Sequence, residues 1–150
     1  RISDDLVTQL LEAAMYAPSA RNEQPWHFIV IDDRKILGQI PSIHPYAEML
    51  REAPLAILVC GDKKIEKSVE YIAIDCAAAT QNILLASHEL GLGSCWLGVY
   101  PRESRMKGLS ELFTLPQNII PISLVAVGYP AEKKETPERF IRERVHLNGW

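Results

Sequence analysis

The sequence lacks the features that mark several common classes of protein. Its three cysteines, Cys60, Cys76 and Cys95, are odd in number and widely spaced, so they predict neither a disulfide framework nor a zinc site. No run of about 18 apolar residues is free of charge and no signal peptide is visible, so we expect no membrane span. The net charge of −3 gives no electrostatic reason to expect nucleic acid or an anionic membrane as a partner. These features favour a reducing cytoplasm.

The common catalytic motifs are also missing. The sequence contains no Ser-His-Asp arrangement, no pair of catalytic carboxylates and no phosphate-binding GxxxxGK loop. Its four histidines are scattered, and none stands at metal-ligand spacing from a cysteine. We therefore expect no metal site, and neither hydrolytic nor phosphoryl-transfer chemistry.

Composition and patterning predict one α/β or α+β domain. The 150 residues are enough for a single core and too few for two ordinary domains, and 47% apolar with 23% charged residues is typical of a globular protein. Helical and strand-like segments alternate, which favours three layers, helix–sheet–helix, around one central sheet. The predicted helices cover 3–17, 34–40, 46–52, 69–90 and 101–113, and the predicted strands cover 26–31, 55–60, 94–100 and 119–127.

The segment 69–90 has the longest helical pattern. Ile72, Cys76, Ile83 and Ser87 form one stripe, and alanines and leucines make much of the remainder apolar. A helix that is apolar nearly all round is usually a buried one. We therefore expect this helix to be covered on nearly all sides.

Pro18 to Trp26 is the most informative stretch, because it places amide, guanidinium and indole groups between a helix pattern and a strand pattern. Binding groups concentrate on loops that a rigid scaffold positions. Asn22 and Gln24 each carry amide donors and an acceptor, so the pair can read a heterocycle whose edge alternates C=O and N–H, as a flavin edge does. The alternative is a plain proline-bounded surface loop with Trp26 as a core anchor, and the loop alone favours neither.

Three other features are ambiguous on their own. Gly91 and Gly93 would let the main chain approach a flat ligand, but a simple turn that caps the helix is the favoured interpretation. Arg139 could bind a phosphate through its guanidinium fork, although a tail of mixed charge usually forms a solvated surface. Cys95 has no visible base nearby, so we expect a small core residue rather than a nucleophile.

Taken together, four segments resemble the nitroreductase family of FMN-dependent oxidoreductases. They are APSARNEQPW at 17–26, GLGSCWLG at 91–98, VGYP at 127–130, and the ending from Arg139 through Val145-His146 to Trp150. Their order and spacing cover nearly the whole chain, which makes the combined resemblance specific.

The resemblance implies a set of contacts with the flavin. In this family the first loop lies beside the ring, which implies contacts from Ser19 and Asn22, with Gln24 a weaker candidate. The family's glycine-rich turn places main-chain groups near N5 of the ring, which corresponds to Leu92 and Gly93 here.

At the FMN phosphate the sequence departs from the family's pattern. The family's late basic residue binds the phosphate, and Arg139 matches it best. The family usually also has a short motif, Arg-Arg-Ser-x-Arg, before the first helix, whereas only Arg1 stands there in this sequence. We expect either a trimmed chain or a form that binds FMN weakly, and the immediate start of a well-capped helix favours trimming.

The resemblance further implies an α+β nitroreductase-like fold over residues 1–150, with a central mixed, mainly antiparallel sheet flanked by helices. FMN would carry the chemistry without a catalytic side chain, and NAD(P)H would be the electron donor. The implied reaction is ping-pong reduction of a small acceptor, such as a nitroaromatic or a quinone, by a homodimer with FMN at the subunit interface. A flavin-binding protein with little turnover, acting as a cofactor reservoir or regulatory module, is the alternative. A specialised dehalogenase or flavin-destroying relative is a more remote one.

Overall fold

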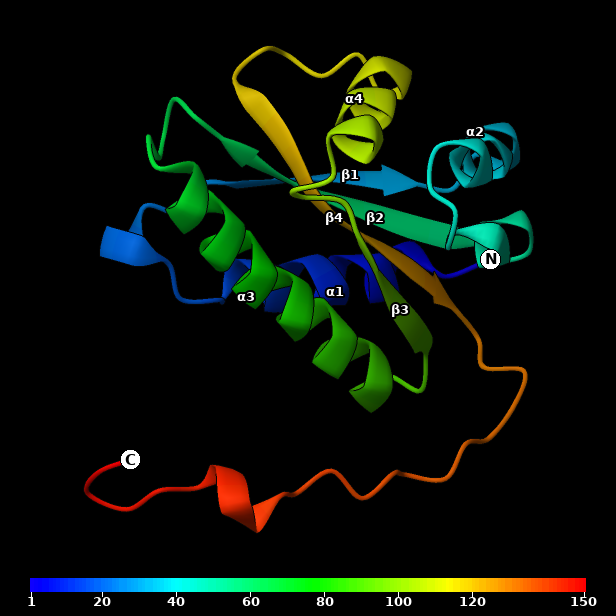
Figure 1. The fold of residues 1–150 in the computed structure, drawn as a ribbon. Helices are drawn as coiled ribbons and strands as arrows, with labels where there is room; N and C mark the ends of the chain where they lie inside the picture. The colour runs from blue at the N-terminus through cyan, green and yellow to red at the C-terminus, as the bar shows by residue number, and fades with distance from the viewer.

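Helices cover both faces of one four-stranded sheet in the computed structural model, which describes all of residues 1–150 (Figure 1). This arrangement confirms the predicted helix–sheet–helix layering. The strands are β1 (Trp26–Ile31), β2 (Leu55–Asp62), β3 (Gly93–Gly98) and β4 (Ile119–Gly128). The α-helices are α1 (Asp4–Met15), α2 (Arg34–Gln39), α3 (Val69–Glu89) and α4 (Glu103–Leu112). Short 3-10 turns are η1 (Ala20–Asn22), η2 (Ile40–Ser42), η3 (Glu48–Arg51) and η4 (Arg142–Arg144).

The sheet has the order β1-β2-β4-β3, and all three pairings are antiparallel. The mainly antiparallel sheet that the family resemblance implies is therefore confirmed. β2 and β4 occupy the centre, in a register that pairs Leu55 with Val127. β2 is buried along its whole length, as its continuous apolar run predicts for a strand covered on both faces.

Side chains of the central strands enter two separate cores. On one face, Ile57 and Val125 belong to a core that includes Ile83 of α3 and residues of α1. On the other face, Leu58 belongs to a core that includes Leu109 of α4 and residues of α2. Because successive residues of a strand point to opposite faces, neighbours such as Ile57 and Leu58 are divided between the two cores.

The main helices begin where their capping residues predict. Ser3, Asp33 and Ser68 precede α1, α2 and α3, and each side chain accepts a hydrogen bond from a backbone N–H of the first turn. The segment 46–52 is an exception, because it forms only the 3-10 turn η3. Its buried side chains, Ala47 and Leu50, are three residues apart, which is the repeat of a 3-10 helix.

The expectation that the longest helix is covered on nearly all sides is wrong for α3. The predicted stripe is indeed buried, but the other side leaves Tyr71, Ile74 and Leu85 exposed by 45%, 64% and 60%. These three residues, called here the α3 face, lie along one side of the helix at helical spacing. The sequence could not distinguish a helix side covered within the chain from an apolar side left bare. α3 is also not apolar enough to cross a bilayer, and no other helix in the chain is a candidate span.

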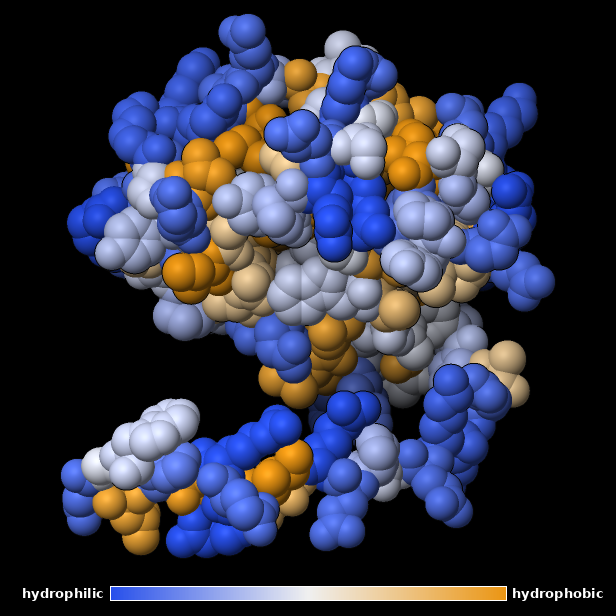
Figure 2. Space-filling view, viewed as in Figure 1, coloured by the Kyte–Doolittle hydropathy of each residue, from blue (hydrophilic) through white to orange (hydrophobic).

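Residues 131–150, called here the tail, extend away from the rest of the molecule. Every residue of the tail is exposed, including the apolar side chains of Phe140, Leu147 and Trp150. Figures 1 and 2 show the tail leaving the end of β4 and passing beneath the sheet and its helices without packing on them. The chain therefore leaves two sets of apolar side chains uncovered, those of the α3 face and those scattered along the charged tail.

Candidate functional site

The loop between α1 and β1 has an unusual backbone conformation. Arg21, Asn22 and Gln24 have φ values of 53°, 56° and 51°, and they are three of the five non-glycine residues in the chain with positive φ. Residues with a Cβ rarely adopt this conformation, and those that do cluster at ligand-binding sites. Ser19 stabilises the loop, because its Oγ accepts a 3.0 Å hydrogen bond from the Gln24 N–H.

Hydrogen bonds fix the two amide side chains of this loop relative to each other. Gln24 Nε2 donates to the backbone carbonyl O of Asn22 at 3.2 Å and to Asn22 Oδ1 at 3.1 Å. Both side chains are exposed, and Asn22 Nδ2 and Gln24 Oε1 make no hydrogen bond within the chain. The loop therefore offers a free amide donor close to a free carbonyl acceptor, the pair required to read an edge that alternates C=O and N–H.

Two buried acids and one indole attach the loop to the rest of the molecule. Asp75 of α3 accepts a 2.9 Å hydrogen bond through Oδ1 from the Ala20 N–H. Glu66, only 2% exposed, forms an ion pair with Arg21. Trp26, 8% exposed, begins β1 and lies in the core between the sheet and α1 and α3, which confirms the anchoring role expected for it.

The glycine-rich turn joins α3 to β3. Gly91 has a φ of 72°, so this turn uses the conformational freedom of glycine. The Leu92 N–H donates to the Ser87 carbonyl O at 2.8 Å, and its side chain is only 5% exposed. The turn thus caps the helix, and Leu92 can offer a ligand little more than its carbonyl group. At Gly93 the side that lacks a side chain faces the neighbouring strand, because a Cβ there would contact the Gly128 carbonyl O at 3.6 Å and Pro130 at 3.7 Å.

Gly93 lines a hollow of about 540 Å³ at this end of the sheet. Its other walls come from the ends of β3 and β4, the segment before β2 and the start of the tail, and they include Pro54, Cys95, Gly128, Tyr129 and Lys134. The expectation that Cys95 is a core residue is wrong. β3 is an edge strand, and its outer part leaves Cys95 and Trp96 exposed.

The loop and the glycine-rich turn lie at opposite ends of α3 (Figure 1). The loop contacts Asp75 in the N-terminal part of the helix, whereas Gly93 follows the C-terminal end. With 21 residues, α3 spans about 30 Å. The structure therefore brings together Ser19, Asn22 and Gln24, and separately Leu92 and Gly93, but it does not join these two groups within one chain.

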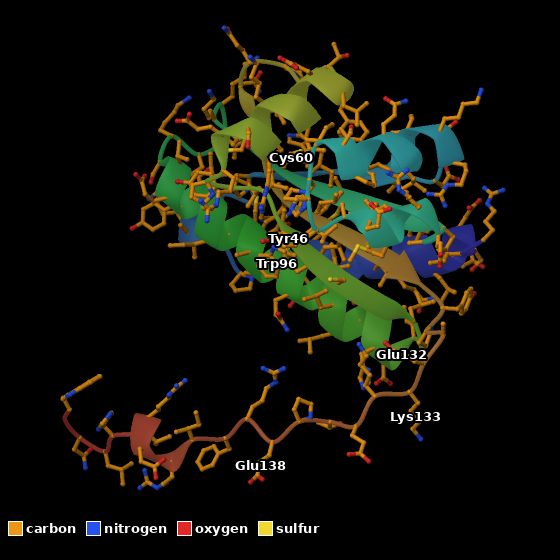
Figure 3. The ribbon with its side chains drawn as sticks, turned by 45° about the vertical axis from the view of Figure 1, so that its right-hand side comes forward. Tyr46, Cys60, Trp96, Glu132, Lys133 and Glu138 are labelled. Atoms are coloured by element: carbon orange, nitrogen blue, oxygen red, sulfur yellow. The ribbon has the colours of Figure 1, made fainter.

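Arg139 lies far from both groups. It is exposed on the tail, directly after Glu138, which Figure 3 shows below the body of the molecule with Glu132 and Lys133 on the same tail. No hydrogen bond or ion pair links the Arg139 side chain to the rest of the chain. Its guanidinium is therefore available to a ligand or to another copy of the protein.

Burial makes the other reactive groups chemically inert. Cys60 and Cys76 are unpaired and fully buried, and burial raises the pKa of Cys60 to about 12 and also raises the pKa of Cys76. His44 is 1% exposed, and burial lowers its pKa. Its Nδ1 accepts from the Tyr46 N–H at 3.2 Å, so Nε2 carries the proton and donates to the Gly98 carbonyl O at 2.9 Å. These residues are structural.

Sequence reasoning missed Glu66, Asp75 and most of the hollow. Asp75 did carry a signal, because it is the one charged residue on the buried stripe of α3. Glu66 lies in the polar segment 62–68 and carried none. The walls of the hollow come from distant parts of the chain that only the strand pairing brings together.

These features define an α+β protein suited to a flat cofactor with a polar edge, with exposed amide side chains at one end of α3 and a hollow beside the glycine-rich turn at the other. The sequence model of the Nitroreductase family matches residues 1–44 and 41–129. The chain belongs to the nitroreductase family, and it is an oxidoreductase.

Its relatives cover almost the whole chain. It is 48% identical over 149 residues to a protein of Methanothermobacter thermautotrophicus named "Putative NADH dehydrogenase/NAD(P)H nitroreductase", a match that covers 99% of this chain and 78% of that protein. The crystal structure of a "Putative NADH Oxidase" of Clostridium acetobutylicum has a TM-score of 0.96 and 41% identity, covering 100% of this chain and 91% of that one. An FMN-dependent nitroreductase of Clostridium difficile has a TM-score of 0.91 and 30% identity, covering 100% and 90%.

Proposed function

We propose that this chain is an enzyme that takes electrons from NAD(P)H and passes them to nitroaromatic, quinone or related small acceptors in ping-pong order. FMN is its cofactor and NAD(P)H its electron donor, in keeping with relatives named FMN reductase and FMN-dependent nitroreductase. The observation that carries the proposal is the free amide donor of Asn22 beside the free carbonyl acceptor of Gln24, on a loop held in place by buried groups.

The candidate residues fit the separate parts of FMN. The amides of Asn22 and Gln24 suit the alternating edge of the ring, and the Ser19 hydroxyl hydrogen is free because its Oγ serves as an acceptor within the loop. Gly93 is partly exposed and lines the hollow of about 540 Å³, where a flat ring would meet its main chain. The guanidinium of Arg139 matches the geometry of phosphate oxygens.

The chain's own residues orient the cofactor and leave the redox step to it. When bound, FMN supplies the hydride chemistry, so no protein acid or base is required. Asn22 and Gln24 fix the edge of the ring, and the buried Leu92 side chain excludes water beneath the glycine-rich turn. One face of the ring stays open, and we assign it to the donor and the acceptor in turn, which is the ping-pong order.

A second copy of this chain completes the site in our proposal. The loop contacts α3 at Asp75 and the turn follows Glu89, about 21 Å further along the helix, so we assign the two groups to one FMN only across two copies. The α3 face and the apolar side chains of the tail are uncovered, and exposed apolar patches of this kind mark interfaces between proteins. We therefore assign a homodimer in which the loop of one copy faces Gly93 of the other, and the tail carries Arg139 to the shared phosphate site.

The three unpaired thiols suit a reducing compartment, and we place the protein in the cytoplasm.

We also propose that residues 1–150 form one FMN-binding domain, because a single sheet carries both cores.

The test of the proposed function is anaerobic reduction of bound flavin. Protein incubated with FMN and freed of excess is expected to be yellow, to bleach on addition of NADH or NADPH, and to regain colour with a quinone or a nitroaromatic. A protein that takes up no FMN would overturn the proposal. A protein that binds FMN but is not reduced would instead support a flavin-binding role with little turnover.

A further inference from the structure

We propose that Glu66 and Asp75 are positioning residues that hold the loop 19–24 in its binding conformation before FMN arrives. This inference rests on the proposed function, because it assigns the pre-formed loop to the flavin. Neither acid belongs to the loop itself. Both are nearly completely buried, at 2% and 3% exposure, and both contact the loop between its candidate ligands Ser19 and Asn22.

Asp75 holds the first part of the loop. Its Oδ1 accepts the Ala20 N–H at 2.9 Å, across 55 residues of sequence. Ala20 directly follows Ser19 and begins the 3-10 turn that ends at Asn22. The carboxylate therefore fixes the point at which the chain enters the turn.

Glu66 holds the second part of the loop through Arg21. The Arg21 guanidinium forms an ion pair with Glu66 and lies over the ring of Tyr71, with its Cζ 5.4 Å from the ring centroid. Glu66 is itself fixed, because its Oε1 accepts the Ser68 N–H at 2.8 Å at the start of α3. Arg21 is thus attached to the same helix that carries Asp75.

The loop needs such a hold because its backbone is strained. Three of its residues, Arg21, Asn22 and Gln24, have positive φ, a conformation that persists only where the surroundings enforce it. The Ser19 Oγ and the Gln24 amide also make hydrogen bonds, but both partners lie within the loop, so these bonds do not attach it to the rest of the molecule. Asp75 holds Ala20, and Glu66 and Tyr71 hold Arg21, so these three residues attach the start of the strained segment to the body. A loop ordered in advance binds its ligand more tightly.

The Asp75 side chain also lowers the stability of the folded state, which supports a functional reason for its presence. Its Oδ2 is buried and has no hydrogen-bond partner. A buried acceptor without a partner destabilises the folded state. Local departures of this kind are expected where a residue serves a site rather than the stability of the core.

The first test compares FMN affinity among variants by quenching of flavin fluorescence. Asp75→Ala removes the acceptor for the Ala20 N–H, and we expect FMN binding to weaken about tenfold, while Asp75→Asn keeps an acceptor and restores most of the affinity. Glu66→Gln is expected to weaken binding by a similar factor. Glu23→Gln is the matched control, because Glu23 lies 3.7 Å from Arg21 but is a surface residue, and it should change nothing. Equal affinity in all four variants would overturn the inference.

The second test uses the protein without cofactor, so that it does not depend on the proposed function. Hydrogen exchange of the backbone amides in 19–24 is expected to accelerate about tenfold in Asp75→Ala and Glu66→Gln, and to stay unchanged in Glu23→Gln. Unchanged exchange in the first two variants would overturn the inference even if the wild type binds FMN. Wild-type protein that fails to bind FMN would overturn the proposed function. Faster exchange in the Asp75→Ala and Glu66→Gln variants would still show that these two acids order the loop.

Discussion

The two ends of α3 offer a ligand different kinds of contact. At the N-terminal end, a strained loop presents side-chain donors and acceptors, and buried acids of the same helix region hold it. At the C-terminal end, a glycine-rich turn lies beside an open hollow whose walls combine apolar residues with Glu52, Ser94, Tyr129 and Lys134. A flavin requires both, since its edge is polar and its face is flat. In the function we propose, each end supplies half of the site.

The variant with the largest expected effect prevents two copies from associating and so separates the loop of one copy from the turn of the other. Ile74→Glu combined with Leu85→Glu places two charges on the α3 face, and burying such charges in an interface costs at least about 3 kcal/mol, or roughly a hundredfold in dimer affinity. We expect a monomer by sedimentation velocity, with loss of FMN binding. Ser104→Glu, which adds a charge on the exposed surface of α4 on the other side of the sheet, is the control. A variant that stays monomeric yet binds FMN normally would argue that one chain suffices.

A second change tests whether the tail belongs to the same site. Arg139→Ala removes a charged phosphate contact and should weaken FMN binding by about 2 kcal/mol, or roughly thirtyfold. Riboflavin, which lacks the phosphate, should bind the variant and the wild type equally. Arg144→Ala, another exposed arginine of the tail, is the control. Equal losses of FMN and riboflavin would mean that Arg139 acts on something other than the phosphate.

The two halves also differ in how far the sequence predicted them. Asn22 and Gln24 could be proposed from the residues themselves, because amides on a proline-bounded loop have a chemical meaning without knowledge of the fold. Gly93 could be proposed only through the family resemblance, since a helix cap explains the same glycines. The hollow beside it could not be predicted, because strand pairing brings Gly93 next to Gly128.

The fold itself was largely predictable, since capping residues and apolar periodicity are local signals. The starts of α1, α2 and α3 and the span of β1 agree with the sequence prediction. Apart from the segment 46–52, which forms only a 3-10 turn, the main errors concern what covers each surface. Leu85 and Cys95 are apolar, but the chain places no element over either of them. Coverage depends on tertiary and quaternary contacts that one sequence pattern does not contain.

A third change tests the loop alone. Asn22→Gly removes the amide and keeps a residue that tolerates the observed φ of 56°, so it separates the contact from backbone strain. We expect about tenfold weaker FMN binding, because the flavin edge loses its donor in a partly buried site. Asn148→Gly removes the other asparagine with positive φ and is the matched control. Affinity unchanged in Asn22→Gly would remove Asn22 from the site.

The smallest expected effect is a difference in acid sensitivity between two regions. Burial lowers the pKa of His44 below its ordinary 6.5, so the stability linked to His44 is complete above pH 6.5 and falls as the pH drops below it. At Asp62, beside the loop, burial acts to raise the pKa, but hydrogen bonds from Asn118 and the Lys64 N–H outweigh it, and the pKa lies below its ordinary 3.8. Its contribution is complete above pH 3.8 and is lost only in stronger acid.

Urea unfolding between pH 4 and pH 7 measures this difference. The wild type should lose stability in this range, whereas His44→Gln should start less stable and show a flatter profile. A wild-type profile that is flat from pH 7 to pH 4 would show that His44 is not held neutral as the structure indicates.

The central claim is that one FMN takes its loop from one copy and its glycine-rich turn from another, and mixing two defective variants tests it directly. Asn22→Gly damages the loop, and Gly93→Val displaces the turn because its branched side chain would press on Gly128 and Pro130. Gly98→Ala, where an added methyl group meets nothing within 4 Å, is the harmless control on the same strand. After co-refolding of equal amounts, a shared site predicts recovery of about a quarter of the wild-type FMN sites, because each mixed dimer contains one intact loop–turn pair. No recovery above that of the separate variants, in mixtures shown to contain mixed dimers, would contradict the account.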